Sequence, residues 1–221
     1  MFIGHFAVGL ASKRVAPHAS LGVLMAAPNL LDLLWPIFLL LGWEQVRIDP
    51  GNTAFTPLDF VSYPISHSLL TACVWGVLFA LVYWTLTRYL RGAVVIACSV
   101  ASHWVLDFVT HRPDMPLYPG GPRVGLGLWN SVPATIAIEA AMYVAGAWLY
   151  LSMTRARDRV GSYALLAFLT FGLLTYVANI LGPPPPNAHA IAVVTLALWL
   201  VPFWAWWFDC HREVTLPPHL P

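Results

Sequence analysis

Two side chains that could bind a metal ion or transfer a proton, His103 and Asp107, stand four residues apart in an apolar segment that begins near Gly92. In a helix this spacing puts both side chains on one face, one turn apart. Within a bilayer an imidazole and a carboxylate are costly unless they pair, face water or hold an ion, so such residues are functional by default. The pair alone is equally compatible with metal binding and with a structural hydrogen bond.

The composition indicates a polytopic membrane protein. Of the 221 residues, 59% are hydrophobic and 10% are charged, and the mean hydropathy is +0.70. A soluble domain normally carries about 25% charged residues. The net charge of +1 gives no basic excess of the kind that favours nucleic acid binding. Cys73, Cys98 and Cys210 lack CxxC spacing, and we interpret them as small core residues.

Six segments reach the roughly 20 apolar residues that a spanning helix needs. Residues 2–12 are apolar but too short to cross a bilayer, so we expect a half-length helix there, and no basic region of a cleaved signal peptide precedes Lys13. The sequence therefore predicts an all-α polytopic membrane helix bundle that forms one integral domain over residues 1–221. The six predicted spans are residues 20–42, 67–87, 92–111, 132–152, 162–181 and 189–208.

Basic residues are concentrated in alternate connections between the predicted spans, and the positive-inside rule assigns these connections to the cytoplasm. We therefore expect a multi-pass protein of the cell inner membrane with both ends of the six-span bundle in the cytoplasm. Connections 43–66, 112–131 and 182–186 would then face outward. The basic residues are Lys13, Arg14, Arg88, Arg91, Arg155, Arg157, Arg159 and Arg212.

With this topology, the rise of 1.5 Å per helical residue places several potential metal ligands at one depth near the outer face. His67 lies at the start of the second span, with Ser66 as the expected N-cap. Mixed imidazole and carboxylate ligands suit zinc best, with manganese and iron as alternatives. One or two ions fit the set, since Asp107 or Asp32 can bridge a pair. The candidate ligands are His5, Asp32, His67, His103 and Asp107.

The ordered set resembles the membrane-bound metal-dependent hydrolase family, whose members are distantly similar to zinc-dependent phospholipase C. The resemblance covers roughly residues 1–140. It implies a membrane hydrolase in which the five candidate ligands bind zinc. The residues that carry it are His5, Pro28 with Asp32, His67-Ser68, His103-x-x-x-Asp107, Thr110-His111, and residues 125–131 with Glu139.

Two positions depart from the family pattern. Asn29 stands where many members have a second aspartate, and Thr135 stands four residues before Glu139, where a histidine would be needed. A third zinc, as in the secreted phospholipases, is therefore not expected.

The predicted reaction is hydrolysis of a phosphoester or similar bond in a lipid or amphiphile whose head group lies at the outer interface. Glu139 or Asp114 could orient the attacking water as general base, and His111 would face the substrate or support a ligand. Arg112 and Arg123 could hold a phosphate. Each of these residues also has a structural alternative, namely helix pairing for Glu139 and solvation for the arginines. His18, His189, His211 and His219 are assigned no role.

Two other classes of protein would use the same polar residues. A transporter or ion-binding protein employs intramembrane acids and histidines as relays, but it needs them through both leaflets. The inner halves of spans two to six are almost wholly apolar. In a structural helix bundle, His–Asp pairs would hold neighbouring helices together, and each hydrogen bond would contribute roughly 0.6 kcal/mol to stability. A cavity open only to the outer face favours hydrolysis, a through-going polar path favours transport, and the lack of any cavity favours the scaffold.

Overall fold

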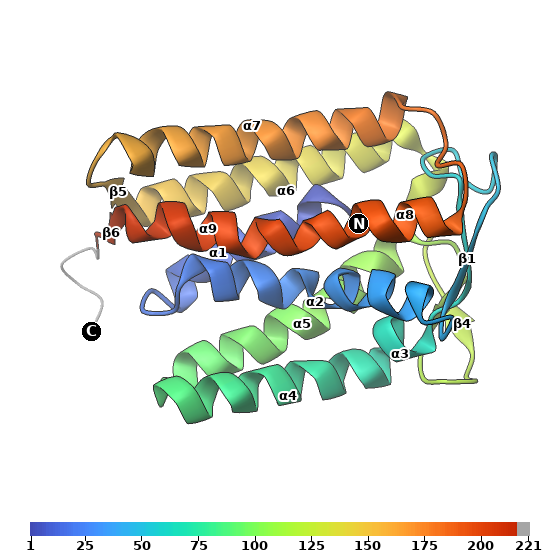
Figure 1. The fold of residues 1–221 in the computed structure, drawn as a ribbon, viewed down its shortest axis with the longest axis horizontal. Helices are drawn as coiled ribbons and strands as arrows, with labels where there is room; N and C mark the ends of the chain where they lie inside the picture. Colours follow the sequence, from blue (N-terminus) through green and yellow to red (C-terminus); the bar gives the residue numbers. More distant parts are fainter. Residues whose placement is uncertain (216–221) are drawn as a thin grey trace.

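The structure, a computed structural model, describes residues 1–215, so His219 lies outside it. Within this range six helical segments are long and apolar enough to cross a membrane, which confirms the predicted all-α bundle. They run side by side along one axis (Figure 1). They are α2 (Leu21–Leu40), α4 (Leu69–Thr87), α5 (Leu90–Thr110), α6 (Val132–Met153), α7 (Arg159–Leu181), and the succession of α8 (Ala188–Thr195), η2 (Leu196–Trp199) and α9 (Leu200–Cys210).

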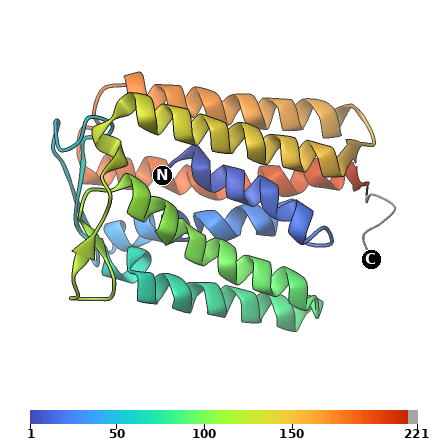
Figure 2. The ribbon, with the colours of Figure 1, turned by 180° about the vertical axis from the view of Figure 1, so that it is seen from behind.

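The short N-terminal helix α1 (Ile3–Val15) lies inside the bundle, where it packs against α6, α2 and α5 (Figure 2). Its apolar side chains Ile3, Phe6 and Leu10 are buried. A Cβ at Gly146 of α6 would lie 2.5 Å from the Ala7 carbonyl oxygen, so only glycine permits this approach. The half-length helix is thus enclosed by the spans, and its first turn is carried deep into the protein.

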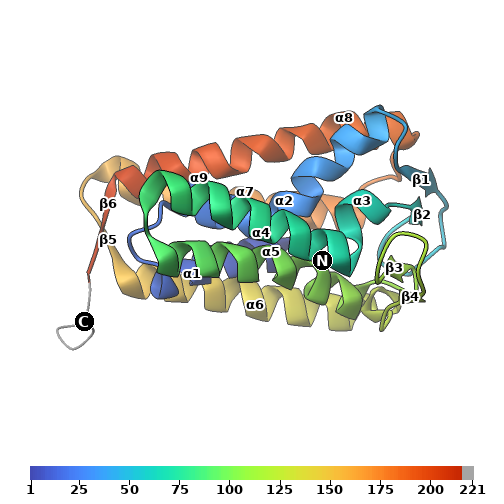
Figure 3. The ribbon, with the colours of Figure 1, turned by 90° about the horizontal axis from the view of Figure 1, so that it is seen from below.

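Among residues 1–215, three short two-stranded antiparallel sheets cover the two ends of the bundle, and none was predicted (Figure 3). Strands β1 (Gln45–Ile48) and β2 (Leu58–Ser62) pair at one end, as do β3 (Met115–Pro116) and β4 (Arg123–Val124). We name this the hairpin end. At the opposite end β5 (Thr154–Ala156) pairs with β6 (Arg212–Val214). The basic connections between the spans gather there, and we name it the basic end (Figure 1).

Asp209 ties several helices together at the basic end. Its carboxylate accepts hydrogen bonds from Lys13 Nζ at 2.7 Å, from the Leu21 amide at 2.9 Å and from the Tyr150 hydroxyl at 2.8 Å. Lys13 and Asp209 are both buried or nearly so. The buried lysine is therefore fully paired, and α1 is fixed to α2, α6 and α9 at the end away from His5.

The start of the second span also differs from the prediction. Ser66 and His67 do not begin the second span, because Pro64 starts a separate turn, α3 (Pro64–His67). The backbone is extended at Ser68, and the Ser68 side chain caps α4 by accepting from the Thr71 amide. The predicted cap at Ser66 is therefore wrong, and that hydroxyl is available for another partner.

The outer surface of the bundle is apolar, as a lipid-facing surface must be. Leu86 and Leu181, for example, each expose 79% of their surface. Cys73, Cys98 and Cys210 are free thiols and are also exposed, so the interpretation of these cysteines as core residues is wrong. They lie on outward faces of α4, α5 and α9, where a small apolar side chain is as acceptable against lipid as it is in a core.

Candidate metal centre

Four helices bring the five predicted ligands together near the hairpin end. The ligands divide into two groups that share one residue, His103. In each group, one donor atom per residue lies within 4.8 Å of the others. All are buried except Asp32, whose side chain is 31% exposed. The groups are His5, His103 and Asp107 from α1 and α5, and Asp32, His67 and His103 from α2, α3 and α5.

The spacing in the second group fits a metal site. His67 Nε2 lies 3.4 Å from Asp32 Oδ1 and 3.3 Å from His103 Nε2, and the remaining pair, His103 Nε2 and Asp32 Oδ1, is 3.9 Å apart. Ligands about 2.0–2.1 Å from a tetrahedral zinc ion stand about 3.4 Å from one another. These three donors already have nearly that separation.

Hydrogen bonds to the far side of each imidazole determine which nitrogen faces the centre. His103 Nδ1 donates to the Pro28 carbonyl at 2.7 Å. His67 Nδ1 lies 2.6 Å from Ser66 Oγ, and that hydroxyl donates to Glu44 Oε2, also at 2.6 Å. Because a carboxylate only accepts, the Ser66 proton is committed to Glu44 and His67 Nδ1 must donate to Ser66. The neutral form of each ring therefore turns an unprotonated Nε2 toward the other.

Glu44 is the part of the site that the sequence did not predict. Its carboxylate is buried and also accepts the amides of Ile65 and Ser66, each at 2.8 Å, at the start of α3. The only sequence signal is an acidic residue just beyond the first span. Glu44 belongs to an irregular connection, so helical periodicity could not bring it next to His67.

Asp107 completes the centre from the α5 side. Its Oδ1 accepts from His5 Nε2 at 3.1 Å and from the Met1 amino group, and its Oδ2 lies 3.0 Å from His103 Nε2. The His5 and His103 rings stack with their centroids 3.8 Å apart. Asp107 is thus positioned between the two groups, where it can contact an ion in either.

His111 and Asp114, two of the predicted catalytic residues, form a pair beside the centre. Asp114 Oδ1 accepts from His111 Nδ1 and from the Tyr63 hydroxyl, both at 2.9 Å. Burial lowers the pKa of His111, and burial together with the Asp114 carboxylate raises the pKa of Tyr63 well above its usual range. The neutral ring therefore directs an unprotonated Nε2 toward Asp107 Oδ2, 3.9 Å away.

The remaining predicted catalytic and substrate-binding residues, Arg112, Arg123 and Glu139, bond to other protein groups. None of the three lines the cavity that adjoins the centre. Arg112 pairs with Asp59 and with Asp114, and Arg123 donates to the Val61 carbonyl at 2.8 Å. Both arginines thus fix the loops of the hairpin end. Glu139 Oε2 accepts the amides of Phe2 at 2.8 Å and Gly4 at 3.2 Å, so it holds the first turn of α1 and thereby positions His5.

Glu139→Ala is expected to destabilise the fold. It removes the acceptor of two amides in the interior, and a lost hydrogen bond to a charged group typically costs about 1.5–3 kcal/mol. The measurement is the thermal unfolding midpoint in detergent, with Glu213→Ala as control because Glu213 is exposed on β6. Equal midpoints for the two variants would show that Glu139 does not support α1.

One cavity of about 530 Å³ adjoins the centre. Asp32, His67, Asp107 and His111 line its charged end, and the rest is lined mostly by aromatic and aliphatic side chains together with Thr56, Thr175, Asn179 and Thr195. His103 and His5 do not line the cavity, so they lie on the side of the centre that faces away from it. The residues that line this cavity lie in the part of the bundle toward the hairpin end, and Lys13 and Asp209, which pair at 2.7 Å at the basic end, do not line it.

Comparison with known proteins adds no family or fold assignment, since no family model, no curated protein and no solved structure matches the chain.

Proposed function

We propose that this membrane protein is a metal-dependent hydrolase that cleaves a phosphoester or similar bond of a lipid-like substrate, with zinc as its ion. The observation that carries the proposal is the crowding of acceptors around His103 Nε2. His67 Nε2, Asp32 Oδ1 and Asp107 Oδ2 lie 3.3, 3.9 and 3.0 Å from it. One added proton on His103 can be directed at only one of them, whereas a cation can contact them all.

The candidate ligands and the residues bonded to them would have different roles. Asp32, His67 and His103 would hold one ion, and His5, His103 and Asp107 offer donors for a second. Such an ion supplies stabilisation for negative charge on a phosphoryl oxygen and lowers the pKa of nearby water. Glu44, through Ser66, and the Pro28 carbonyl would keep the two rings in the tautomer that binds metal.

His111 is the best-placed general base. Its Nε2 faces the cavity end that Asp107 also lines, and Asp114 holds the ring through Nδ1. His111 would take a proton from water as the water oxygen bonds to phosphorus, and it would return the proton to the alcohol oxygen as the old phosphoester bond breaks. Asp114 thereby acts as a positioning residue. Glu139 supports α1 in this scheme, and a role as base is not needed.

The shape of the cavity favours hydrolysis over the two alternatives. A scaffold would leave no cavity beside its locking pairs, and a transporter would need a polar path through to the basic end. We place the protein in the inner membrane with the hairpin end outward, because the basic end would then lie in the cytoplasm. The similarity of the residue pattern to the membrane-bound metal-dependent hydrolase family points the same way.

A matched pair of variants tests this function. Purified wild-type protein with zinc is expected to hydrolyse phospholipid in nanodiscs, and His111→Asn should lower kcat roughly 10²- to 10⁴-fold, the usual contribution of a general base. Zinc content, measured by elemental analysis, should not change. The control is His189→Asn, since His189 is exposed on α8. Folded wild-type protein that binds no zinc, or full activity of the His111 variant, would contradict the proposal.

A further inference from the structure

We propose that the cavity beside the metal centre binds the hydrocarbon chain of a long-chain phosphoester, which reaches it sideways from the bilayer between α7 and α8. The inference rests on the hydrolase function for the head-group end of the substrate. It adds a chain-binding site that the metal ligands do not define, and it narrows the substrate to an amphiphile taken directly from the membrane.

The two ends of the cavity suit the two ends of an amphiphile. Four ionisable side chains line one end, as described above. The remaining wall is largely aromatic and aliphatic, with contributions from α1, α2, β2, α7 and the succession of α8, η2 and α9. Apolar walls favour hydrocarbon and not a wholly polar substrate. Representative wall residues are Phe6, Phe55, Leu58, Phe171, Ile191 and Val201.

The cavity extends to the lipid-facing surface of the bundle. Residues of α7 between Phe171 and Asn179 line it over about 12 Å of helix length. Phe171 is 44% exposed, and Val194 of α8, which also lines the cavity, is 68% exposed. Both belong to segments apolar enough to cross a membrane. A chain could therefore pass from the bilayer to the centre without crossing water.

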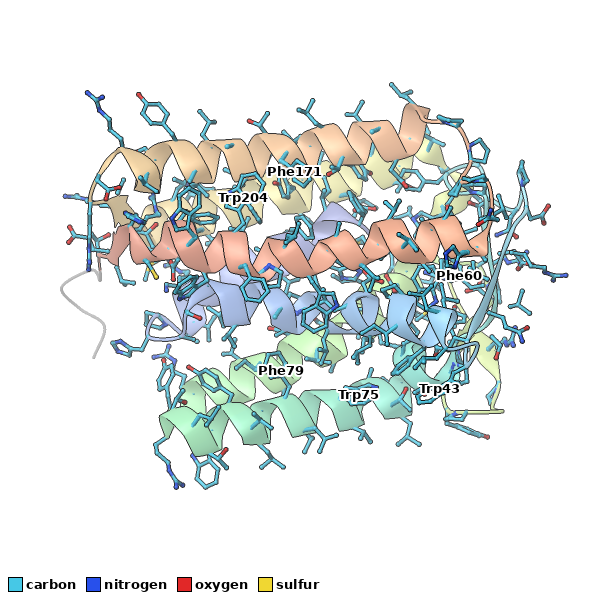
Figure 4. The ribbon with its side chains drawn as sticks, in the orientation of Figure 1. Trp43, Phe60, Trp75, Phe79, Phe171 and Trp204 are labelled. Carbon is cyan, nitrogen blue, oxygen red and sulfur yellow. The ribbon has the colours of Figure 1, made fainter. Side chains whose placement is uncertain are left out.

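The labelled aromatic side chains indicate how far the chain site reaches. Figure 4 shows Phe60 near the hairpin end, and Phe171 and Trp204 further along the bundle between α7 and α9. Phe60 and Phe171 both line the cavity, and the Phe171 ring lies 5.5 Å from the Trp204 ring. Among the α7 residues that line the cavity, Phe171 is the one nearest the basic end.

Two indole groups in the cavity wall point to acceptor atoms in the ligand. Trp35 and Trp129 line the cavity and are 5% and 8% exposed, and neither Nε1–H has a hydrogen-bond partner among residues 1–215. Buried N–H groups are normally paired. An ester or phosphoester linkage next to the chain would supply oxygen acceptors, which a plain hydrocarbon could not.

The test uses hexadecylphosphocholine with a photoreactive diazirine near the end of its chain. The full-length protein in nanodiscs is irradiated with the probe, and labelled peptides are identified by mass spectrometry. We expect label on residues 171–179 and 191–198. Ala178→Trp would fill the opening with an indole group. We expect it to lower this labelling roughly tenfold, because the indole would overlap the position of the bound chain. Ala178 lines the cavity and is exposed.

Ala167→Trp is the matched control, because Ala167 is also exposed on α7 but does not line the cavity. The two alanines are eleven residues apart, about three helical turns, so they lie on nearly the same face. Label spread evenly along the lipid-facing side of α7, or equal labelling of the two variants, would overturn the chain site. The probe requires no hydrolysis, so selective labelling of a protein without zinc-dependent activity would retain the chain site and reject the hydrolase.

Discussion

Zinc should be lost from the purified protein when His103 is replaced by alanine. His103 belongs to both groups of candidate ligands, so this one substitution removes a nitrogen donor from each. Structural zinc sites with four ligands bind with about 10–16 kcal/mol. Loss of one ligand should then cost roughly 3 kcal/mol, or more than about a hundredfold in affinity. The measurement is the zinc content, by elemental analysis, after dialysis against a series of chelators of increasing zinc affinity.

The substitution His18→Ala is the appropriate control. His18 is exposed in the connection between α1 and α2, at the basic end, and its ring contacts Tyr89 edge-on. It should retain full zinc binding. Membrane insertion should be normal in both variants, because neither changes the hydrophobicity of a span appreciably. If His103→Ala keeps stoichiometric zinc, the two groups of donors around it do not form the metal centre.

The spans were predictable because a bilayer imposes their length. A run of about 20 apolar residues has few alternatives in a chain that must satisfy every backbone group within hydrocarbon. The hairpins were not predictable in this way. Strands β1 and β2 are short, and their pairing joins Arg47 to Asp59 across a connection that carries no alternating pattern. Such pairing depends on contacts with the end of the bundle that a linear pattern does not contain.

The candidate ligands were predictable for a related reason. Rise per residue fixes the depth of Asp32, His103 and Asp107 once their helices are assigned, and the short helix α1 is positioned by its connection to α2. The depth of a residue in its helix does not predict which partners the side chains of the loops contact. Arg112 and Arg123 were predicted to hold substrate, but the structure directs them to Asp59 and to a backbone carbonyl. Glu44 was assigned no role, although its bonds determine the orientation of His67.

Glu44→Gln is expected to weaken zinc binding by roughly 10- to 100-fold, the range typical of groups that orient a ligand. The introduced glutamine can still accept the two amides through its carbonyl oxygen, but its amide nitrogen must then donate to Ser66 Oγ. The Ser66 proton would turn to His67 Nδ1, and His67 would carry its own proton on Nε2. That tautomer cannot bind a metal through Nε2. The measurement is zinc affinity by competition with a chromogenic chelator.

A purely structural role for Glu44 predicts something different. It would lower the stability of the metal-free protein and would leave the affinity of the folded fraction unchanged. Reversal of the hydrogen-bond chain keeps the number of bonds the same, so metal-free Glu44→Gln should unfold near the wild-type temperature while its affinity falls. Ser66→Ala further distinguishes control of the His67 tautomer from a structural role. It removes the hydroxyl that links Glu44 to His67, and it leaves the Glu44 bonds to the amides of Ile65 and residue 66 intact. Equal zinc affinity in wild type and Glu44→Gln would show that His67 does not depend on this relay for its tautomer.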